Sequence, residues 1–452
     1  MLENVGQSIP EATGCWSQCK ALYRLLERDE ITWDSLIQTH GTNSIRRVAR
    51  RGEQVVLNVQ DTSSLNFQTH SKLEGQGPIG SSKKATGFHL HATALVGADS
   101  GIFHGILGAK IYARDAQKRS KQTKGTRNRE RIEDKESYRW IESMKMSIDC
   151  RESLQGIARK EEKAAPQVVN VGDREADIYE LLCEAQNHKE QGVHLLVRSK
   201  HNRKLEAPED GQSKLWDTLA KQKKCGKVTI RVPRSKGIRE REAVCEIRFK
   251  KLTLAVPAHK EKYLGAEQTI TLTAIELVEI EREGKEESKA IHWKLLTTWP
   301  VESLEEARRM VRWYANRWNI EVFFRVLKTG CRVERRQFGS IATLWPMIVL
   351  DLITAGYVMG LTSTAQAQPL VLASDFFSIG SLEALGAFYG EKKEKMAKIN
   401  LQDAVKMVSR LGGHLGRKGD GPPGAEVLWR GTTKLTHITE AWEIFESRQR
   451  CG

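Results

Sequence analysis

Two short runs of β-branched and apolar residues, each leading to an aspartate, constrain the fold of this chain more than any other feature. The first is Gln54-Val-Val-Leu-Asn-Val-Gln60, followed by Asp61, and the second is Val168-Val-Asn-Val-Gly172, followed by Asp173. Apolar runs this short are typical of buried strands. Residues 176–185 then show helical spacing, so Asp173 lies at a strand-to-helix junction, where functional side chains commonly protrude from a sheet.

The rest of the pattern predicts an α/β chain of several parts. Its 452 residues exceed the ~250 to 300 that one hydrophobic core usually supports. Alternation at 88–96 and 101–111 predicts a β-meander after the first strand, and period-two segments at 227–232, 243–256 and 268–280 predict a β-rich insertion. The expected parts are a small N-terminal helical unit (1–50), a core in two pieces (51–198 and 291–370), the insertion (199–290) and a C-terminal helical domain (371–452).

Two apolar segments of the C-terminal half suggest packing surfaces. The run from Met347 to Leu361 is interrupted by Asp351 and Gly356, which favours a buried core helix over a membrane span. The last predicted helix carries Leu435, Ile438, Trp442 and Phe445 on one stripe, which requires a partner surface in this chain or in another copy.

Composition favours a polyanionic partner and a reducing compartment. Lys and Arg number 72 against 57 Asp and Glu, a formal charge of +15, and nucleic acid is the first candidate partner. The eight cysteines include no CxxC pair, as expected of a cytoplasmic protein. The strongly basic residues 114–131 predict an exposed loop, either a solvated segment or one that contacts DNA.

The segment Tyr314–Lys328 places four functional groups at helical spacing. Tyr314, Arg317, Glu321 and Lys328 lie at offsets of three, seven and fourteen residues, so on one α-helix they would fall within about 60° of each other. Such a stripe suits phosphate and metal. A solvated helix face braced by an Arg317–Glu321 pair is the alternative.

Asp61, Asp173 and Glu321 together form an oxygen ligand set suited to Mg²⁺ or Mn²⁺. Two such ions can activate an attacking oxygen and stabilise a leaving one in phosphoryl transfer. Alternatively, Asp173 simply caps the following helix. His89 and His91 alternate on one predicted strand, and hydrogen-bonded histidines are favoured there over a metal pair.

These motifs, in this order, resemble the IS-four-type insertion-sequence transposases, the group that includes the transposase of Tn5. Tyr314-x2-Arg317-x3-Glu321-x6-Lys328 is similar to the family's Y-R-E-K motif. Asp61-Thr-Ser-Ser-Leu and Val171-Gly-Asp173-Arg-Glu-Ala-Asp are similar to its two aspartate motifs. Further similarity covers 196–204, Trp293-Lys-Leu-Leu-Thr, 300–304 and Arg410-Leu-Gly-Gly, and thus nearly the whole chain.

The resemblance implies an RNase H-like core, a mixed sheet with flanking helices, that holds Mg²⁺ (or Mn²⁺) on the triad Asp61, Asp173 and Glu321. The implied reaction is cut-and-paste DNA transposition: end nicking, hairpin formation and opening, and strand transfer. Its implied partners are the terminal inverted repeats, target DNA and a second copy of the chain, in the bacterial cytoplasm at the nucleoid. The implied DNA-binding residues are Tyr314, Arg317, Lys328, Arg198, Lys200, Arg203, Lys204, Trp293 and Trp318.

Two of these assignments have alternatives. Trp293 matches the family tryptophan that receives a flipped base, but it also alternates with Ile291 and Leu295 as a core strand would. Asp61 lies closer to Met1 than the family pattern predicts, as though about half of the usual N-terminal domain were absent. A regulator that forms inactive dimers with a full-length transposase, or a start codon assigned too far downstream, would fit the same feature.

Overall fold

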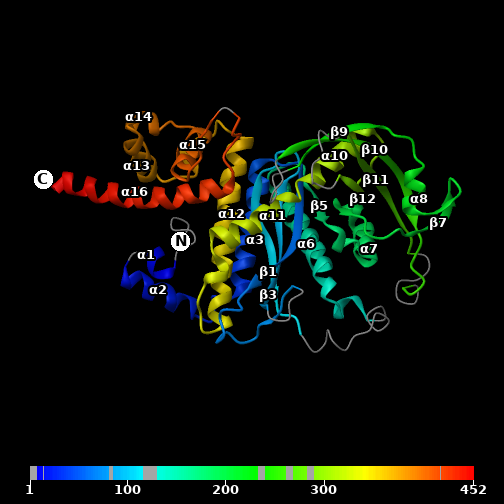
Figure 1. Ribbon diagram of the computed structural model, residues 1–452, viewed down its shortest axis with the longest axis horizontal. Helices are drawn as coiled ribbons and strands as arrows, with labels where there is room; N and C mark the ends of the chain where they lie inside the picture. Colours follow the sequence, from blue (N-terminus) through cyan, green and yellow to red (C-terminus); the bar gives the residue numbers. More distant parts are fainter. Residues whose placement is uncertain are drawn as a thin grey trace. The chain divides into compact units, whose positions relative to one another are not determined.

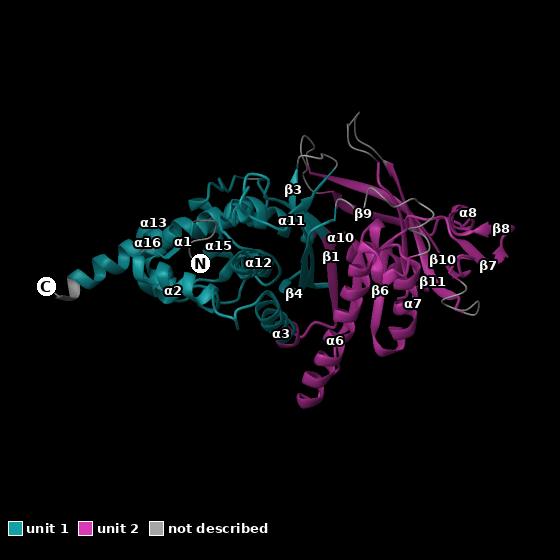
Figure 2. Cartoon of the chain, turned by 90° about the horizontal axis from the view of Figure 1, so that it is seen from below, with its two compact units in different colours: residues 1–47, 62–116, 319–452 teal, residues 48–61, 117–318 magenta. Residues whose placement is uncertain are grey.

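The structure is a computed structural model that describes residues 8–13, 15–80, 85–115, 130–232, 240–260, 268–281, 290–417 and 419–451. The chain divides into two compact units, shown in teal and magenta in Figure 2. Unit 1 comprises residues 1–47, 62–116 and 319–452, and unit 2 comprises residues 48–61 and 117–318. Strand β1 (Val55–Asn66) therefore begins in unit 2 and ends in unit 1.

Unit 2 is organised by a mixed sheet whose central strands lie side by side in Figure 1. β1 pairs in parallel with β5 (Gln167–Gly172), and β5 pairs in parallel with β6 (Val193–Arg198). Beyond β6 the sheet continues antiparallel through β12 (His292–Thr297), β11 (Ile270–Glu281) and β10 (Arg241–Leu254). Shorter strands complete it: β7 (Lys204–Glu209), β8 (Gln212–Lys214) and β9 (Gly226–Val232).

Helices of unit 2 cover this sheet with large apolar side chains. α6 (Arg139–Lys160) contributes Trp140 and Met144, and α7 (Tyr179–His188) contributes Leu181 and Leu182, to a core that includes alternate residues of β6. α8 (Leu215–Ala220) joins the same core. α10 (Leu304–Ala315) begins with the predicted capping box, in which Ser303 and Glu306 bond each other's backbone amides.

Unit 1 combines the first strands with most of the helices. β3 (Thr86–Gly97) pairs antiparallel with β4 (Phe103–Tyr112) and with the short β2 (Gly77–Pro78). A separate apolar cluster unites the C-terminal helices. The helices are α1 (Ile9–Thr13), α2 (Trp16–Leu26), α3 (Trp33–Arg51), α11 (Trp318–Arg325), α12 (Ile341–Ala367), α13 (Ile379–Tyr389), α14 (Lys393–Met396), α15 (Leu401–Leu411) and α16 (Ala425–Cys451). The end of α3, residues 48–51, and the first residue of α11, Trp318, belong to unit 2.

The mixed α/β class predicted from the sequence is confirmed. Neighbouring strands follow the order β4-β3-β1-β5-β6, with β5 and β6 parallel to β1 and the later strands antiparallel. This mixed sheet with flanking helices is consistent with an RNase H-like core. The strands predicted at 88–96, 101–111, 168–172 and in the insertion all form, within a few residues of the predicted bounds.

The prediction that the first strand ends at Asp61 is wrong, because β1 continues to Asn66. Thr62 and Ser64 resemble turn formers in the sequence, but their hydroxyls bond the ring nitrogens of two buried histidines of β3. The Thr62 Oγ1 to His91 Nδ1 distance is 2.9 Å, and the Ser64 Oγ to His89 Nδ1 distance is 3.2 Å. These contacts support the extended strand, and both histidines are hydrogen-bonded, as expected.

The prediction of one continuous helix through Tyr314–Lys328 is also wrong. α10 ends at Ala315, where the Asn316 and Arg317 amides form three-residue bonds to the carbonyls of Trp313 and Tyr314 and so tighten the last turn. α11 then ends at Arg325, and residues Val326–Gly330 form a π-helix. The spacing alone could not show these two interruptions, since no glycine or proline marks the first.

The apolar run at Met347–Leu361 belongs to a longer helix than predicted. α12 has 27 residues and a mean hydropathy of 1.6 over its most apolar window, so by length and composition it could cross a membrane. Within the protein, however, 61% of that window is buried. Its Asp351 is paired with Arg336, and Met347 packs against Ile9, Cys19 and Leu26, which is the behaviour of a core helix.

Candidate active site

The register of the parallel strands aligns Asp61 with Asp173. Val55 is opposite Gln167 and Val59 is opposite Val171, so the same offset sets Asp173, the residue after β5, level with Asp61. Adjacent strands lie about 4.8 Å apart. Two carboxylates therefore emerge from neighbouring backbones of unit 2 at the same height.

Buried amides on the opposite face of these strands fix that register. The Gln60 amide donates to the Asn170 side-chain oxygen. Asn58 and Asn170 also donate to the Ser147 hydroxyl of α6, at 2.8 and 3.0 Å. All four residues are fully buried, where polar groups need partners. Asn58 and Asn170 lie three residues before Asp61 and Asp173, and Gln60 directly precedes Asp61. This support could not be recognised from sequence motifs.

Asp173 also caps the helical turn that follows it. Its Oδ1 accepts the backbone N–H of Glu175 at 2.7 Å and so begins the 3₁₀ turn Arg174–Ala176. The capping role considered as an alternative is therefore present. A carboxylate has further lone pairs, so the cap leaves capacity for another ligand.

Arg317 lies beside Asp61. Its Nη1 is 3.2 Å from Asp61 Oδ2, and both side chains are mostly buried. Because Arg317 is in the link after α10, the turn that ends this helix aims its guanidinium at β1.

Tyr314 occupies a buried position among charged groups of the same unit. Burial raises the pKa of its phenol, as does the nearby Asp173 carboxylate, whereas Arg317 and Arg198 oppose the shift. Its ring meets Trp293 edge to face at 5.0 Å between centroids. Asp173, Arg198, Tyr314 and Arg317 therefore form one cluster.

Arg198, the last residue of β6, brings a second guanidinium to this cluster. It is held by a bond from Nη2 to the His292 carbonyl at 3.1 Å. Burial lowers its pKa, and Arg174 and Arg317 act in the same direction. Trp293 of β12 is half-buried, so its ring combines core packing with partial exposure.

Glu321 and Lys328 belong to unit 1. Glu321 is half-buried on α11. Lys328, in the π-helix, donates from Nζ to the Ser64 carbonyl of β1 at 2.5 Å. Its Nζ also lies 4.0 Å from the Glu334 carboxylate, which accepts the backbone N–H of Asn66 at 2.8 Å. Burial lowers the pKa of Lys328. Single π-turns of this kind occur frequently at functional sites.

The remaining predicted DNA-binding residues differ from one another in exposure. Trp318 is half-buried at the start of α11, and Lys200 and Lys204 are exposed. Arg203 instead pairs with the buried Asp177 at 2.6 Å. Of the basic segment 114–131, residues 116–129 lie outside the described residues.

Among the described residues, no three His, Cys, Asp or Glu side chains group together as a candidate metal site. Asp61 and Asp173 belong to unit 2 and Glu321 to unit 1. The local geometry therefore supplies an aligned pair of carboxylates with two guanidinium groups and a phenol beside them. Such a set can bind a divalent cation and a phosphate.

Two family models match the chain. One, described as "Transposase DDE domain", matches residues 183–350, and the other, described as "Transposase Tn5 dimerisation domain", matches residues 377–451. Together they cover more than half of the chain. The first match includes Trp293 and the segment Tyr314–Lys328, and it begins after both aspartates.

The chain is also similar to a solved structure, the cryo-EM structure of a piggyBac transposase synaptic complex with hairpin DNA. Identity is 12% and the TM-score is 0.33, with 86% of this chain and 53% of that chain covered. The chain thus spans about half the length of that protein. At this TM-score the likeness supports no argument about the site.

Proposed function

Because the chain belongs to the Tn5-like DDE insertion-sequence transposases, we propose that it catalyses cut-and-paste transposition of DNA by phosphoryl transfer. The observation that carries this proposal is the shared level of Asp61 and Asp173 on adjacent parallel strands, with Arg317 on Asp61. The proposed steps are nicking of the element's end, hairpin formation, hairpin opening and strand transfer. Each is an in-line attack on phosphorus by water or a 3′-hydroxyl, so one site serves them all.

DDE transposases generally use divalent metal ions, and the donor chemistry of this chain fits Mg²⁺ or Mn²⁺. Asp61 and Asp173 offer only hard carboxylate oxygens, and we propose Glu321 as the third ligand. When bound, the metal would lower the pKa of the attacking water or hydroxyl and neutralise charge on the phosphate.

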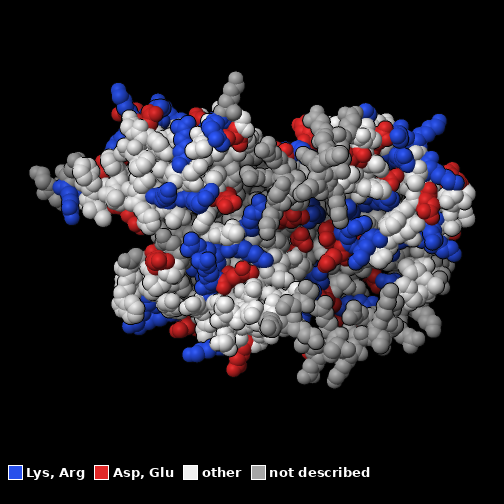
Figure 3. Space-filling view, in the orientation of Figure 1, with Lys and Arg blue, Asp and Glu red and all other residues white. Residues whose placement is uncertain are grey.

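The cationic side chains are proposed to hold the DNA backbone. Arg198 and Arg317 present planar forks that match phosphate oxygens, whereas Lys328 provides a point charge. Lys200 and Lys204 are exposed and would contact further phosphates of the DNA backbone. On the face drawn in Figure 3, Lys and Arg side chains are interspersed with Asp and Glu side chains.

The aromatic residues are proposed to hold the end of the DNA. Trp293 is half-buried and supported edge to face by Tyr314, an arrangement that would let it stack on an unpaired base. Trp318 would brace the same end. Tyr314 is more than nine-tenths buried, so its role is to orient Trp293 and the neighbouring guanidinium groups through its ring and hydroxyl.

Cleavage of a terminal repeat tests the function. A labelled duplex that carries the inverted repeat flanking the gene should be nicked at the repeat end in Mg²⁺ or Mn²⁺ and converted to a hairpin. Removal of the metal with EDTA should stop the reaction, because without a cation the carboxylates repel the anionic phosphate and the attacking oxygen is not activated. A protein that binds this duplex but leaves it uncut in both metals would contradict the proposal.

We further propose that the chain forms homodimers on DNA and acts at the bacterial nucleoid. The helix α16 belongs to the matched dimerisation domain, and two of its apolar side chains, Ile444 and Phe445, are 56% and 52% exposed. Upstream on the predicted stripe, Leu435 and Ile438 pack into the C-terminal core, and Trp442 lies beneath Lys393 at 5.7 Å. The end of the stripe is thus the part available to a second copy.

Phe445→Glu should therefore weaken self-association by about tenfold or more, since a buried interfacial aromatic often contributes over 1 kcal/mol. The measurement is the dimer dissociation constant from sedimentation equilibrium. Ser447→Glu adds the same charge at another exposed position of α16 and should have little effect. Equal dissociation constants for the parent and the Phe445 variant would place the dimer contact elsewhere.

A further inference from the structure

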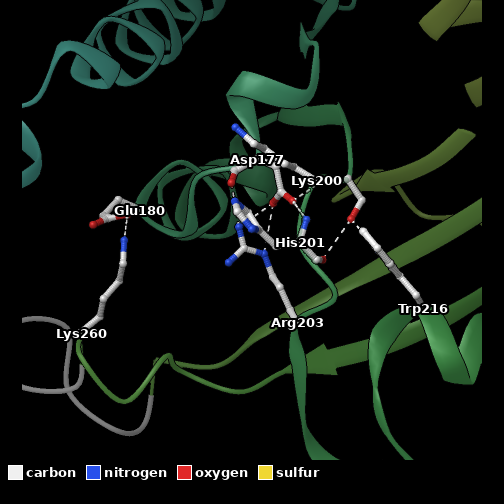
Figure 4. A network of polar contacts seen from close by, with 8 residues as sticks. Asp177, Glu180, Lys200, His201, Arg203, Trp216 and Lys260 are labelled. Atoms are coloured by element: carbon white, nitrogen blue, oxygen red, sulfur yellow. Dashed lines mark hydrogen bonds and ion pairs between the residues drawn. The ribbon is translucent and has the colours of Figure 1, made fainter. Parts of the chain in front are cut away.

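A buried carboxylate, Asp177, organises the segment that follows β6 (Figure 4). Its side chain has no solvent exposure. Oδ2 accepts the backbone amides of Lys200 and His201 at 2.6 and 2.9 Å. Oδ1 accepts Arg203 Nε at 3.1 Å and Nη2 at 2.6 Å, and the same Nη2 also bonds the Asp177 carbonyl at 2.8 Å. One carboxylate thus bonds three residues of the segment Ser199–Arg203.

The Arg203 guanidinium faces inward. Its side chain is only 11% exposed, and its Cζ lies 5.7 Å from the centre of the Tyr179 ring. In contrast, Lys200 is exposed, and Arg198, at the end of β6, is close enough to Asp173 for their charges to interact. Arg203 therefore differs from its basic neighbours, although the sequence groups them together.

The other residues of the segment are also anchored. Trp216 donates from its indole to the Ser199 hydroxyl at 2.9 Å, and its backbone amide donates to the Asn202 side chain at 2.7 Å. Asp177 itself is four residues after Asp173 and two residues before the start of α7. The same short stretch of chain therefore carries the second aspartate of the site and the anchor of the basic segment.

We propose that Asp177 and Arg203 are positioning residues, which fix the segment Ser199–Arg203 so that Arg198 and Lys200 meet the DNA backbone beside Asp173. Arg203 acts through Asp177 and does not contact DNA. Buried ion pairs contribute little net stability but specify geometry where a planar fork meets a carboxylate. This inference rests on the proposed function for its DNA partner, whereas the anchoring itself is a property of the free protein.

Arg203→Lys separates the positive charge of the side chain from its two-pronged bond to Asp177. Lysine keeps the charge but cannot form the two-pronged bond, so Lys200 and Arg198 should lose their alignment. DNA affinity should fall about tenfold near 0.1 M salt, and the slope of log Kd against log salt should decrease by about one. Arg231→Lys, the same change at an exposed pair with Glu240, should alter neither quantity. Retention of parental affinity and slope by Arg203→Lys would overturn the inference, because a direct phosphate contact survives that change.

Amide hydrogen exchange tests the anchoring without DNA. In Asp177→Asn, which loses the charge and one acceptor oxygen, the amides of Lys200 and His201 should exchange about tenfold faster or more, while the strands β5 and β6 keep their protection. Asp210→Asn, at an exposed aspartate paired with Lys250, is the matched control. Unchanged exchange at the two amides, or a rise shared by the whole sheet, would reject a positioning role. If Asp177→Asn does not fold, Arg203→Lys supports the same measurement.

The two proposals fail in different ways. A parent protein that neither binds nor cuts DNA would remove the proposed function and leave the exchange result standing. A parent that cuts DNA, together with variants whose exchange and affinity match the parent, would remove only the positioning role.

Discussion

Glu321→Ala is expected to abolish strand cleavage while leaving DNA affinity almost unchanged. If Glu321 is the third carboxylate ligand, its loss removes several kcal/mol of transition-state stabilisation, or about a thousandfold or more in rate. Affinity comes mainly from contacts between basic side chains and phosphates, which this change does not touch. Single-turnover cleavage in Mg²⁺ and fluorescence anisotropy with the uncut duplex measure the two quantities.

Glu394→Ala provides the matched control. Glu394 is an exposed glutamate of α14, so its replacement tests the loss of one negative charge far along the chain from the proposed ligands. This variant should cut at the parental rate. If Glu321→Ala also cut at that rate, Glu321 would not be a ligand, and the assignment of the triad would have to be abandoned.

Of the variants proposed here, Arg336→Leu should cause the largest loss in the free energy of unfolding. Arg336 and Asp351 are both buried, and the guanidinium donates to the carboxylate from Nε at 2.9 Å and from Nη2 at 2.6 Å. Removing one partner of a buried pair leaves an uncompensated charge, which costs about 3–5 kcal/mol. The free energy of unfolding from urea titration gives the loss directly.

The loss should depend on pH. Burial raises the pKa of Asp351 from 3.8 to about 6 although Arg336 opposes the shift. The folded chain therefore binds a proton more tightly than the unfolded chain, so this group favours folding below pH 4 and loses that contribution as the pH rises through 6. Without Arg336 the carboxylate can still protonate, so the deficit should be small near pH 5 and large near pH 8.

The double variant Arg336→Leu/Asp351→Leu should recover most of the stability at pH 8, because two apolar side chains leave no buried charge. A deficit of equal size at pH 5 and pH 8 would show that lost packing, and not the stranded carboxylate, is responsible.

Much of the sheet could be predicted because its strands have a simple pattern. Val168–Gly172 and the three insertion strands consist of apolar or alternating residues between polar turns, so tertiary contacts reinforce the local preference. The Ser303–Glu306 capping box acts over three residues and was recognisable for the same reason. Asp173 follows its strand as predicted.

The candidate site was less predictable because it depends on contacts between distant residues. Thr62 and Ser64 remain in β1 because histidines of β3 accept or donate to them, which no local pattern shows. The four-residue stripe assumed an unbroken helix, whereas a tightened turn places Arg317 against Asp61 and a π-turn carries Lys328. Arg203 could not be separated from Lys204 because its partner, Asp177, lies 26 residues earlier.

The buried side-chain amides of β1 and β5 disfavour wrong registers between these two strands. Apart from Asn58, Gln167 and Asn170, the paired residues of β1 and β5 are valine and leucine, which would pack almost as well after a slip of about two residues. After such a slip the amides would lose their partners, at a cost of about 1–3 kcal/mol for each buried group. Misaligned pairings of β1 and β5 are thereby disfavoured during folding. Side chains that take no part in the reaction thus specify the relative position of Asp61 and Asp173.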